Sequence, residues 1–335
     1  MRKVITVCLI SMLLMIMTAC GSESASGDGE GGLEAPDKFL KVGSGPMGSG
    51  WYPITTILSE LYMDKFSGLN VSQIEGGSTA NLKALQIGDI KYGIHYTSDY
   101  ADALKGSGSF DKELDQVAGL GSLYPVYQTI ATLAENEEIN KVEDIVDKHI
   151  FLGPKGGGGP VAFWNMMEEY GIDEKTIEDA GGKISYGNYN DGASMLKDGI
   201  VDIFVGGGAP QVTALQEIEV TQPVKVIPID EDKLKSIREK GIGISSDQLP
   251  AGTYKGLDED IPTYTLVAMF SVRKDLEKEY VYNLTKVFWE NQKPFEDQLP
   301  QRAKYFTLET ALDGIDPETL HPGAVKYYKE KGIIE

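Results

Sequence analysis

Cysteine and histidine are scarce in this sequence, so a thiol-based or histidine-based site is difficult to build from it. The 335 residues include two cysteines and three histidines. Cys8 lies inside an apolar N-terminal run and Cys20 follows that run, which leaves the body of the chain without a pair for a disulfide. His95, His149 and His321 are not spaced as metal ligands on a helix. We therefore expect no metal site and a fold that is stabilised by burial alone.

Positive charge is also in short supply. Lysine and arginine total 31 against 51 aspartates and glutamates, which gives a formal net charge of −20. Nucleic acid is excluded as a partner, because phosphate binding requires a basic face. Beyond Arg2 the only arginines are Arg238, Arg273 and Arg302, and none lies in a glycine-rich loop. The sequence therefore gives no indication of an arginine clamp, and backbone donors must hold any anionic ligand.

The N-terminus carries an export signal. Met1–Lys3 is basic, and the apolar run Val4–Met17 is shorter than the ~20 residues that a membrane-spanning helix needs. The tetrad 17–20, Met-Thr-Ala-Cys, resembles a bacterial lipobox, although Leu is commoner than Met at its first position. We predict a signal peptide over 1–19 and lipidation at Cys20, with a chance cysteine beside an ordinary cleavage site as the alternative. The protein would then be exported and lipid-anchored at the outer face of the cytoplasmic membrane or in the periplasm.

The next segment, residues 20–37, is rich in glycine, serine and acidic residues, which predicts a flexible tether. From residue 39 onward, short apolar runs alternate with helical patterns, as is typical of an α/β fold with a parallel sheet. A body of this length favours two domains. The predicted strands are 39–42, 70–74, 92–96, 150–152 and 203–205, and the predicted helices are 54–66, 79–85, 161–170 and one that includes 193–196.

One internal similarity favours two related lobes. Segments 82–98 and 193–210 both run helix, glycine, apolar strand and turn, with Leu85 aligned to Leu196 and Gly88 to Gly199. Many βα units look alike, so chance similarity is the alternative. Val281, Leu284, Val287 and Phe288 have helical spacing, which predicts a late helix with this apolar stripe facing the core.

Five glycine-rich or turn-rich loops follow predicted strands, at 43–53, 75–81, 97–100, 153–160 and 206–210. Ligands of open parallel sheets bind outside the carboxyl ends of the strands, so these loops are expected to converge. Helix N-termini offer free N–H groups and partial positive charge, which favour a carboxylate or phosphate. We expect Ser78 to cap the helix that follows it and Pro160 to be a first helical residue.

These loops do not match nucleotide-binding motifs. Residues 43–48 spell G-x-G-x-x-G, but helical periodicity begins only after Pro53, and the acidic residue Glu75 comes too late to bind a ribose. In GPKGGGGP the lysine, Lys155, precedes the glycine run, which is not the phosphate-loop order. No G-x-S-x-G elbow is present. We expect no cofactor and no enzymatic activity.

Seven segments together resemble one family. GSGPMGSGWYP, EGGSTANLKALQIGD, YTSDYADA, LYPVYQTIA, VGGGAP, AGTYKGLDEDIPT and LHPGAVKYY, in this order, are similar to the TAXI-type solute receptors of TRAP transporters. The resemblance implies a two-lobed type II periplasmic-binding-protein fold of the α/β class with crossing hinge strands at 124–134 and 264–272. Lobe 1 would comprise 38–123 with 266–335, and lobe 2 would comprise 124–265.

The resemblance also implies a function. The receptor would be a monomer that delivers a small organic acid, a glutamate-like amino acid or a 2-oxo dicarboxylate, to the membrane subunits of a TRAP permease. A ligand-sensing surface lipoprotein of the same fold is the first alternative, and an exported enzyme that uses Asp99 or His95 is the second. This chain departs from the family pattern at Pro46, Met47, Ser49, Gly50, Trp51 and Val126, and it has GGGGP at 156–160, so the resemblance does not identify the ligand.

Sixteen residues are the expected ligand-binding set. Each is expected to offer a backbone donor, to form a wall of the cleft or to match the family pattern. The set comprises Gly45, Met47, Gly48, Gly50, Trp51, Tyr52, Gly77, Ser78, Asn81, Ser98, Asp99, Tyr124, Gly157, Gly158, Gly159 and Gly208. Asp99 has two possible roles, as an acceptor for a ligand ammonium group or as a cap for its own helix.

Overall fold

The computed structural model describes residues 32–335. The expected signal peptide, Cys20 and most of the tether lie outside this range. Residues 33–37, which were predicted to belong to a flexible tether, instead contact the folded part of the chain at Leu33 and Asp37. Leu33 donates a backbone hydrogen bond to the carbonyl of Lys65 (2.8 Å) and accepts one from Ser67 (2.9 Å). Asp37 forms an ion pair with Lys91.

The elements alternate as the apolar pattern predicts. In chain order they are β1 (Phe39–Gly43), α2 (Trp51–Lys65), β2 (Asn70–Ile74), α3 (Ser78–Ile87), β3 (Tyr92–Tyr96), α4 (Thr97–Lys105), β4 (Val117–Leu133), η1 (Val142–Ile145), β5 (His149–Leu152), α5 (Gly158–Glu169), α6 (Glu174–Asp179), β6 (Lys183–Tyr186), α7 (Tyr189–Lys197), β7 (Ile203–Gly208), α8 (Thr213–Glu219), β8 (Val224–Val226), α9 (Glu231–Glu239), β9 (Ser245–Leu249), β10 (Ile261–Arg273), α10 (Lys278–Glu290), α11 (Lys293–Gln298), α12 (Pro300–Ala303), η2 (Pro317–Thr319) and α13 (Pro322–Glu330). No helix in residues 32–335 is long and apolar enough to cross a membrane.

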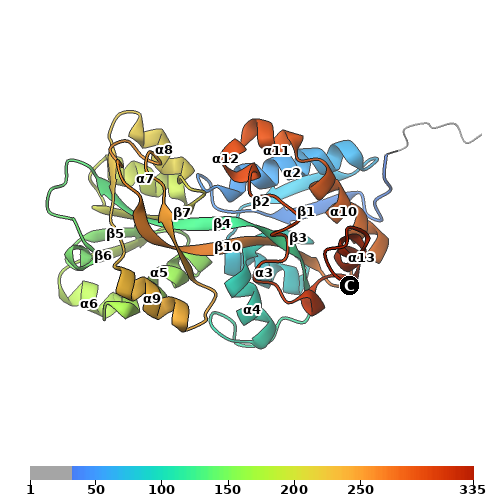
Figure 1. The fold of residues 1–335 in the computed structure, drawn as a ribbon, viewed down its shortest axis with the longest axis horizontal. Helices are drawn as coiled ribbons and strands as arrows, with labels where there is room; N and C mark the ends of the chain where they lie inside the picture. Colours follow the sequence, from blue (N-terminus) through green and yellow to red (C-terminus); the bar gives the residue numbers. More distant parts are fainter. Residues whose placement is uncertain (1–31) are drawn as a thin grey trace, which may run out of the picture. The chain divides into compact units, whose positions relative to one another are not determined.

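Two long strands join the two lobes of the body. The sheet order is β2-β1-β3-β10-β4-β7-β5-β6, with β8 added on β4 and β9 on β10. The pairs β1·β2, β1·β3, β5·β6 and β5·β7 are parallel, whereas β4 and β10 are antiparallel to each other and to β7 and β3. In Figure 1, β4 and β10 run from one lobe into the other, with helices covering both faces of each half. The crossing strands expected at 124–134 and 264–272 are thus parts of longer strands.

The two lobes repeat one topology, which confirms the similarity between segments 82–98 and 193–210. In each lobe the first strand lies between the second and third, and the third pairs with a crossing strand. Leu85 and Leu196 are both buried, at the ends of α3 and α7. Gly88 and Gly199 both have positive φ, of 83° and 67°, where the chain leaves the helix and turns toward the strand.

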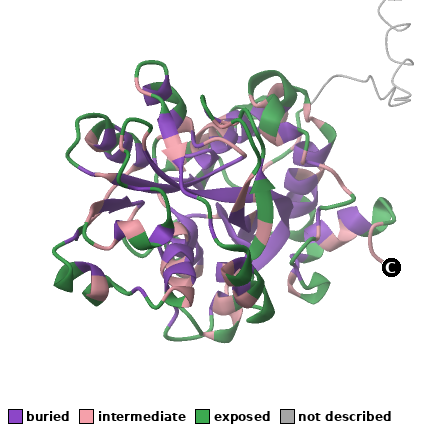
Figure 2. Ribbon diagram, turned by 60° about the vertical axis from the view of Figure 1, so that its left-hand side comes forward, coloured by how far each residue is buried: buried purple, intermediate pink, exposed green. Residues whose placement is uncertain are grey.

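The strands and the inner helix faces form the core (Figure 2). The stripe predicted on α10 is buried as expected, with exposures of 0% to 5% for its four residues. Phe288 lies at the centre of an aromatic cluster, with ring centroids 5.4 Å from Phe270, 5.6 Å from Phe295 and 5.7 Å from Phe306. Burial of rings on this scale fixes the C-terminal helices against the first lobe.

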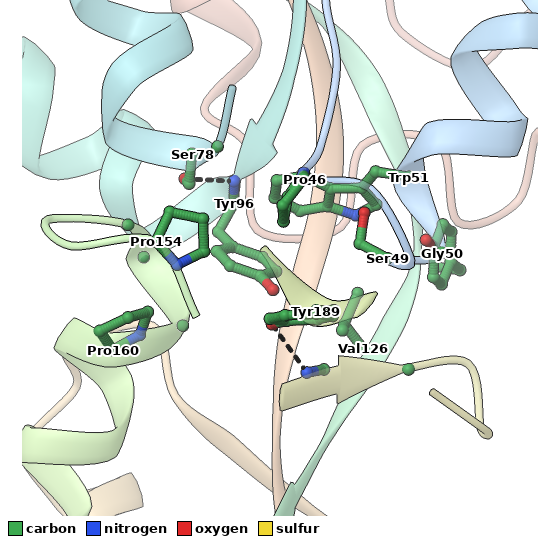
Figure 3. Close-up of a pocket in the computed structure, with 17 residues that line it drawn as sticks. Pro46, Ser49, Gly50, Trp51, Ser78, Tyr96, Val126, Pro154, Pro160 and Tyr189 are labelled. Carbon is green, nitrogen blue, oxygen red and sulfur yellow. Dashed lines mark hydrogen bonds between the residues drawn. The ribbon is translucent and has the colours of Figure 1, made fainter. Parts of the chain in front are cut away.

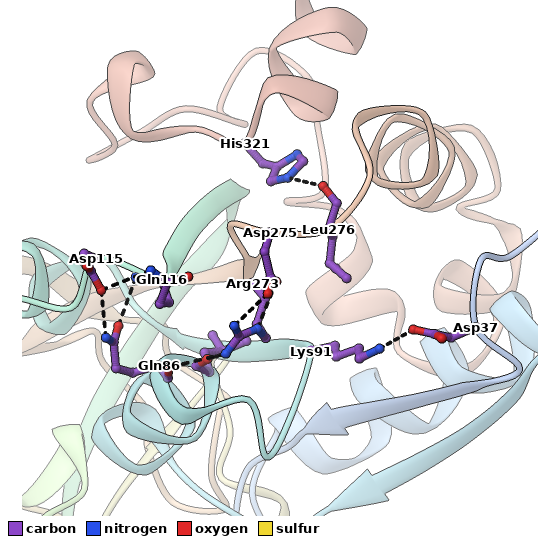
Figure 4. A network of polar contacts seen from close by, with 10 residues as sticks. Asp37, Gln86, Lys91, Asp115, Gln116, Arg273, Asp275, Leu276 and His321 are labelled. Carbon is purple, nitrogen blue, oxygen red and sulfur yellow. Dashed lines mark hydrogen bonds and ion pairs between the residues drawn. The ribbon is translucent and has the colours of Figure 1, made fainter.

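Polar contacts close the ends of the elements. Arg273, the last residue of β10, bonds both carboxylate oxygens of Asp275 (2.9 and 2.7 Å) and the carbonyls of Leu85 and Gln86, the last turn of α3 (Figure 4). The Asp275 carboxylate raises the pKa of the guanidinium. Arg273 is therefore a paired, structural arginine.

The histidines have structural partners. His321 is the N-cap of α13, where Nδ1 accepts from the Gly323 N–H (3.1 Å) and Nε2 lies 3.1 Å from the Leu276 carbonyl. His149 Nε2 lies 2.7 Å from the Ser185 hydroxyl. His95 is fully buried and stacks on Tyr100, and burial lowers its pKa to about 4 although its bond to the Tyr96 carbonyl acts the other way.

Candidate ligand-binding cleft

Four of the five predicted loops meet in one cleft between the lobes (Figure 3). The fifth loop, 97–100, contributes no residue to the lining, although Tyr96, which immediately precedes it, does line the cleft. Nine of the sixteen expected residues line the cleft, namely Gly50, Trp51, Gly77, Ser78, Tyr124, Gly157, Gly158, Gly159 and Gly208. Eight lining residues were not expected, namely Pro46, Ser49, Tyr96, Val126, Pro154, Pro160, Tyr189 and Gly207. In the part of the chain that the structure describes, none of the lining side chains is charged.

Three helix N-termini open into this cleft. The N-cap residues of α2, α3 and α5 are Gly50, Gly77 and Gly157, and no side chain of the described residues caps any of them. Their first N–H groups are therefore available, and each helix presents its positive end. The helices α2 and α3 belong to one lobe and α5 to the other, so an anion between them would contact both lobes.

Three details of these N-termini differ from the sequence predictions. Helix α2 begins at Trp51 and not at residue 54, because Pro53 falls in the first turn, where no N–H is needed. The loop after Gly48 is therefore shorter than predicted. For the same reason Pro160 is the third residue of α5 and not the first. Ser78 lies inside α3 and does not cap it.

Aromatic rings form the walls. Trp51 and Tyr96 are in contact, with ring centroids 4.6 Å apart, and the Tyr189 hydroxyl accepts a bond from the Gly207 N–H (3.1 Å). Burial raises the pKa of Tyr96, Tyr124 and Tyr189. These phenols stay protonated at neutral pH and can donate to an acceptor in the cleft.

Asp99 lies just behind the lining. Its side chain is 6% exposed, and its Oδ2 atom has no hydrogen-bond partner among the described residues. Burial raises its pKa to about 6, and a hydrogen bond with Ser78 acts in the opposite direction. The N-cap of α4 is Tyr96 with no side-chain cap, so the capping role expected for Asp99 is wrong. Its carboxylate instead faces Gly158 of the opposite lobe.

The first glycine loop also joins the lobes directly. The carbonyl of Met47 accepts from the N–H of Tyr189, and the carbonyl of Gly48 accepts from the N–H of Ala214, both at 3.1 Å. Gly48 has φ +80°, which favours glycine. The carboxylate of Glu75 accepts from the Met47 N–H (3.0 Å) and holds the loop in place. Met47 and Gly48 thus lie outside the lining, at a contact that closes the cleft.

The other expected residues outside the lining are Gly45, Tyr52, Asn81 and Ser98. Asn81 is buried and donates to the carbonyls of Ser44 (2.9 Å) and Ile94 (2.7 Å), which ties the ends of β1 and β3 together. Tyr52 lies in the first turn of α2. Ser98 packs against Gly243 of the opposite lobe.

Arg302 is a charged neighbour that the loop motifs did not reveal. A methyl group built on Gly50 would lie 2.9 Å from its Nε atom and 3.1 Å from its Cζ atom, so the guanidinium lies flat against the N-cap of α2. It follows α11 in the sequence, far from the glycine loops, and no local pattern links the two segments. A rule that searches only within loops cannot find it.

The strand order and the interlobe cleft define the class, a two-lobed α/β protein with the type II periplasmic-binding-protein architecture, as the sequence predicted. The chain belongs to the NMT1-like family, whose model matches residues 42–332.

Several solved structures match this chain at low sequence identity and with TM-scores below 0.5. An ancestral arginine-binding protein bound to arginine is 17% identical over 81% of this chain and 99% of its own, with a TM-score of 0.43. The alkanesulfonate-binding protein from Xanthomonas axonopodis pv. citri bound to MOPS is 13% identical over 87% and 84%, with a TM-score of 0.47. The effector-binding domain of a BenM variant is 16% identical over 78% and 96%, with a TM-score of 0.45.

Proposed function

We propose that this protein is an extracytoplasmic solute-binding lipoprotein that captures a small organic acid or amino acid and delivers it to a TRAP-type permease. One observation carries the binding role: the uncapped N-termini of α2 and α3 from one lobe and of α5 from the other open into the same cleft. Preorganised N–H donors and helix dipoles favour a carboxylate there.

Backbone donors can supply the affinity that such a role needs. A hydrogen bond to a charged group contributes ~1.5–3 kcal/mol, so three or four of them support a micromolar dissociation constant, which corresponds to ~8 kcal/mol. The cleft has a volume of about 30 Å³ in this structure, far below the ~300–1,000 Å³ of typical small-molecule sites. Entry of a solute therefore requires the lobes to open, and a solute that contacts both lobes favours closing them again.

Lipid attachment at Cys20, export and delivery to a TRAP permease are parts of the proposal that depend on the sequence resemblance. The seven segments that carry this resemblance extend over most of the body. Glutamate-like amino acids and 2-oxo dicarboxylates are the first ligands to try. Because none of the described residues that line the cleft has a charged side chain, we expect backbone amides and phenols to determine selectivity among them.

Thermal unfolding with a ligand panel tests the binding role. A ligand at 100 times its dissociation constant adds about 2.7 kcal/mol of stability, which raises Tm by roughly 5 °C for a protein of this size. Glutamate, 2-oxoglutarate, other amino acids and organic acids are compared at constant ionic strength. A flat response at millimolar concentration across the panel would refute the proposal. Labelled palmitate incorporated into the wild type and not into Cys20→Ser tests the anchor, and uptake in cells with and without the receptor tests delivery.

A further inference from the structure

A second groove lies between the lobes beside the cleft, and the two share no lining residue. Its volume is about 620 Å³, within the range of small-molecule sites. One wall comes from the start of α2 and from α11–α12, and the other comes from the segment after β7, from α8 and from the turn after β9. Figure 1 shows α12 and α8 on the same side of the molecule, one on each lobe.

The charge of this groove differs from that of the protein as a whole. The chain has a net charge of −20, yet among the described residues that line the groove there are two cations, Arg302 and Lys304, and no carboxylate. Lys304 is exposed, with its Nζ atom 3.3 Å from the amide oxygen of Gln301. Glu219 lies behind the wall, where it is buried and accepts from Gln211 Nε2 (3.2 Å).

The Arg302 guanidinium has only neutral partners. Its Nη2 atom donates to the Thr213 hydroxyl (3.1 Å) and to the Gln211 carbonyl (3.4 Å). Its Nε atom is buried without an acceptor, and its Nη1 atom has none within residues 32–335. Arg273, by contrast, bonds both oxygens of Asp275. Among the described residues Arg302 therefore has no ion-pair partner, and its Nη1 atom is left without an acceptor.

The position of the Arg302 guanidinium makes its positive charge still less favourable. The guanidinium lies against Gly50, the N-cap of the 15-residue helix α2, so a full positive charge sits at the positive end of a helix dipole. Such an arrangement is unfavourable without a nearby anion. A carboxylate in the groove would offset this positive charge and would give the Nη1 atom of Arg302 an acceptor.

We propose that this groove is a second binding site, distinct from the cleft, that takes a small organic anion through its carboxylate, with Arg302 as the main contact and Lys304 beside it. Both lobes form the walls, so an anion bound there also bridges the lobes. The groove and the cleft share no lining residue, so the proposal goes beyond the function proposed above.

Isothermal titration of the purified protein with succinate at constant ionic strength tests the proposal. We expect Arg302→Gln to weaken succinate binding by roughly 10- to 100-fold, through loss of charge-assisted hydrogen bonds. Arg302→Lys keeps the charge and loses the fork, so it should fall between the wild type and Arg302→Gln. It also serves as the second variant if the glutamine variant folds poorly. Arg238→Gln, which removes an exposed arginine on α9, is the matched control and should bind as the wild type does.

Succinamide, which has a similar size and no charge, should not compete. Three results would overturn the proposal: no succinate binding in the millimolar range, equal losses in Arg302→Gln and Arg238→Gln, or equal binding of succinamide. Succinate binding that is lost in Gly158→Ala and kept in Arg302→Gln would also overturn it, because the anion would then occupy the cleft. That last result leaves the proposed solute-binding function intact.

Discussion

Gly158 offers a way to open the cleft without changing its chemistry. A methyl group built on this glycine would overlap Asp99 Oδ2 and would lie 2.7 Å from Tyr96 Cδ2 and 2.9 Å from Ser78 Cβ. All three neighbours belong to the opposite lobe, on β3, α3 and α4. Two of them are fixed by the backbone or by a packed ring. In Gly158→Ala the overlap can therefore be relieved most easily by moving the lobes apart.

The size of the effect follows from the cost of overpacking. Inserting a methyl group into a packed site costs about 1–3 kcal/mol. Here that cost applies only to the closed arrangement, because in the open one the methyl group faces solvent. Each 1.4 kcal/mol is a factor of ten, so the ratio of closed to open molecules should fall by about 5- to 150-fold. The affinity for a solute that needs closure should fall by a similar factor.

Small-angle X-ray scattering measures this opening directly. We expect a larger radius of gyration for Gly158→Ala than for the wild type, with a similar midpoint of unfolding in urea. Gly159→Ala is the matched control for closure, because its methyl group would have its nearest neighbour at 3.6 Å, an ordinary contact. Wild-type scattering in Gly158→Ala would show that the two lobes do not meet at this residue, and the account of the cleft would fail.

Three further predictions concern stability, measured by urea denaturation. Asp99 has a pKa raised to about 6, so its folded form binds more protons than the unfolded chain and stability falls as pH rises from about 4 to 6. His95 has a pKa lowered to about 4, so stability rises from about pH 4 to 6.5, and the two slopes oppose each other. In Asp99→Asn the contribution of Asp99 is removed, so the free energy of unfolding should rise from about pH 4 to 6. A free energy of unfolding that still falls over this range would contradict the raised pKa of Asp99. Asn81→Ala removes the buried amide that donates to the carbonyls of Ser44 and Ile94 and should cost roughly 1–3 kcal/mol; a cost near zero would mean that water replaces the amide. Phe288→Ala removes the central ring of the aromatic cluster and should cost about 3–5 kcal/mol, and a loss below 1 kcal/mol would show that the cluster is loosely packed.

Local patterns predicted the elements and their order well, because alternation and helical periodicity depend on neighbours in the chain. The strands 70–74 and 92–96 match the structure residue for residue. Helix starts were less accurate where proline lies in the first turn, as at Pro53 and Pro160, since proline interrupts the apolar pattern without interrupting the helix. The convergence of four loops followed from a topological rule that needs no side-chain detail.

Local sequence patterns could not predict contacts between segments that lie far apart in the chain. Tyr96 and Tyr189 line the cleft because one ends a strand and the other begins a helix in the opposite lobe, and neither lies in a glycine-rich motif. Arg302 reaches the first loop from the C-terminal helices. An arginine was not expected there, because none of Arg238, Arg273 and Arg302 lies in a glycine-rich loop. The sequence did not show which of them lies near the loops.

The glycines at the helix N-termini show how this long-range arrangement affects the cleft. Gly50 has φ −65° and ψ −19°, which any residue adopts, and a side chain at this position would have to displace the guanidinium of Arg302. Gly158 is likewise crowded by Asp99. One N-terminus therefore has a guanidinium behind it and another has a carboxylate. The α2 side of the cleft is the more positive one, and we expect the carboxylate of a bound solute to lie there, with any ammonium group toward α5. A ligand-bound structure with the opposite orientation would mean that the backbone amides outweigh these two charges.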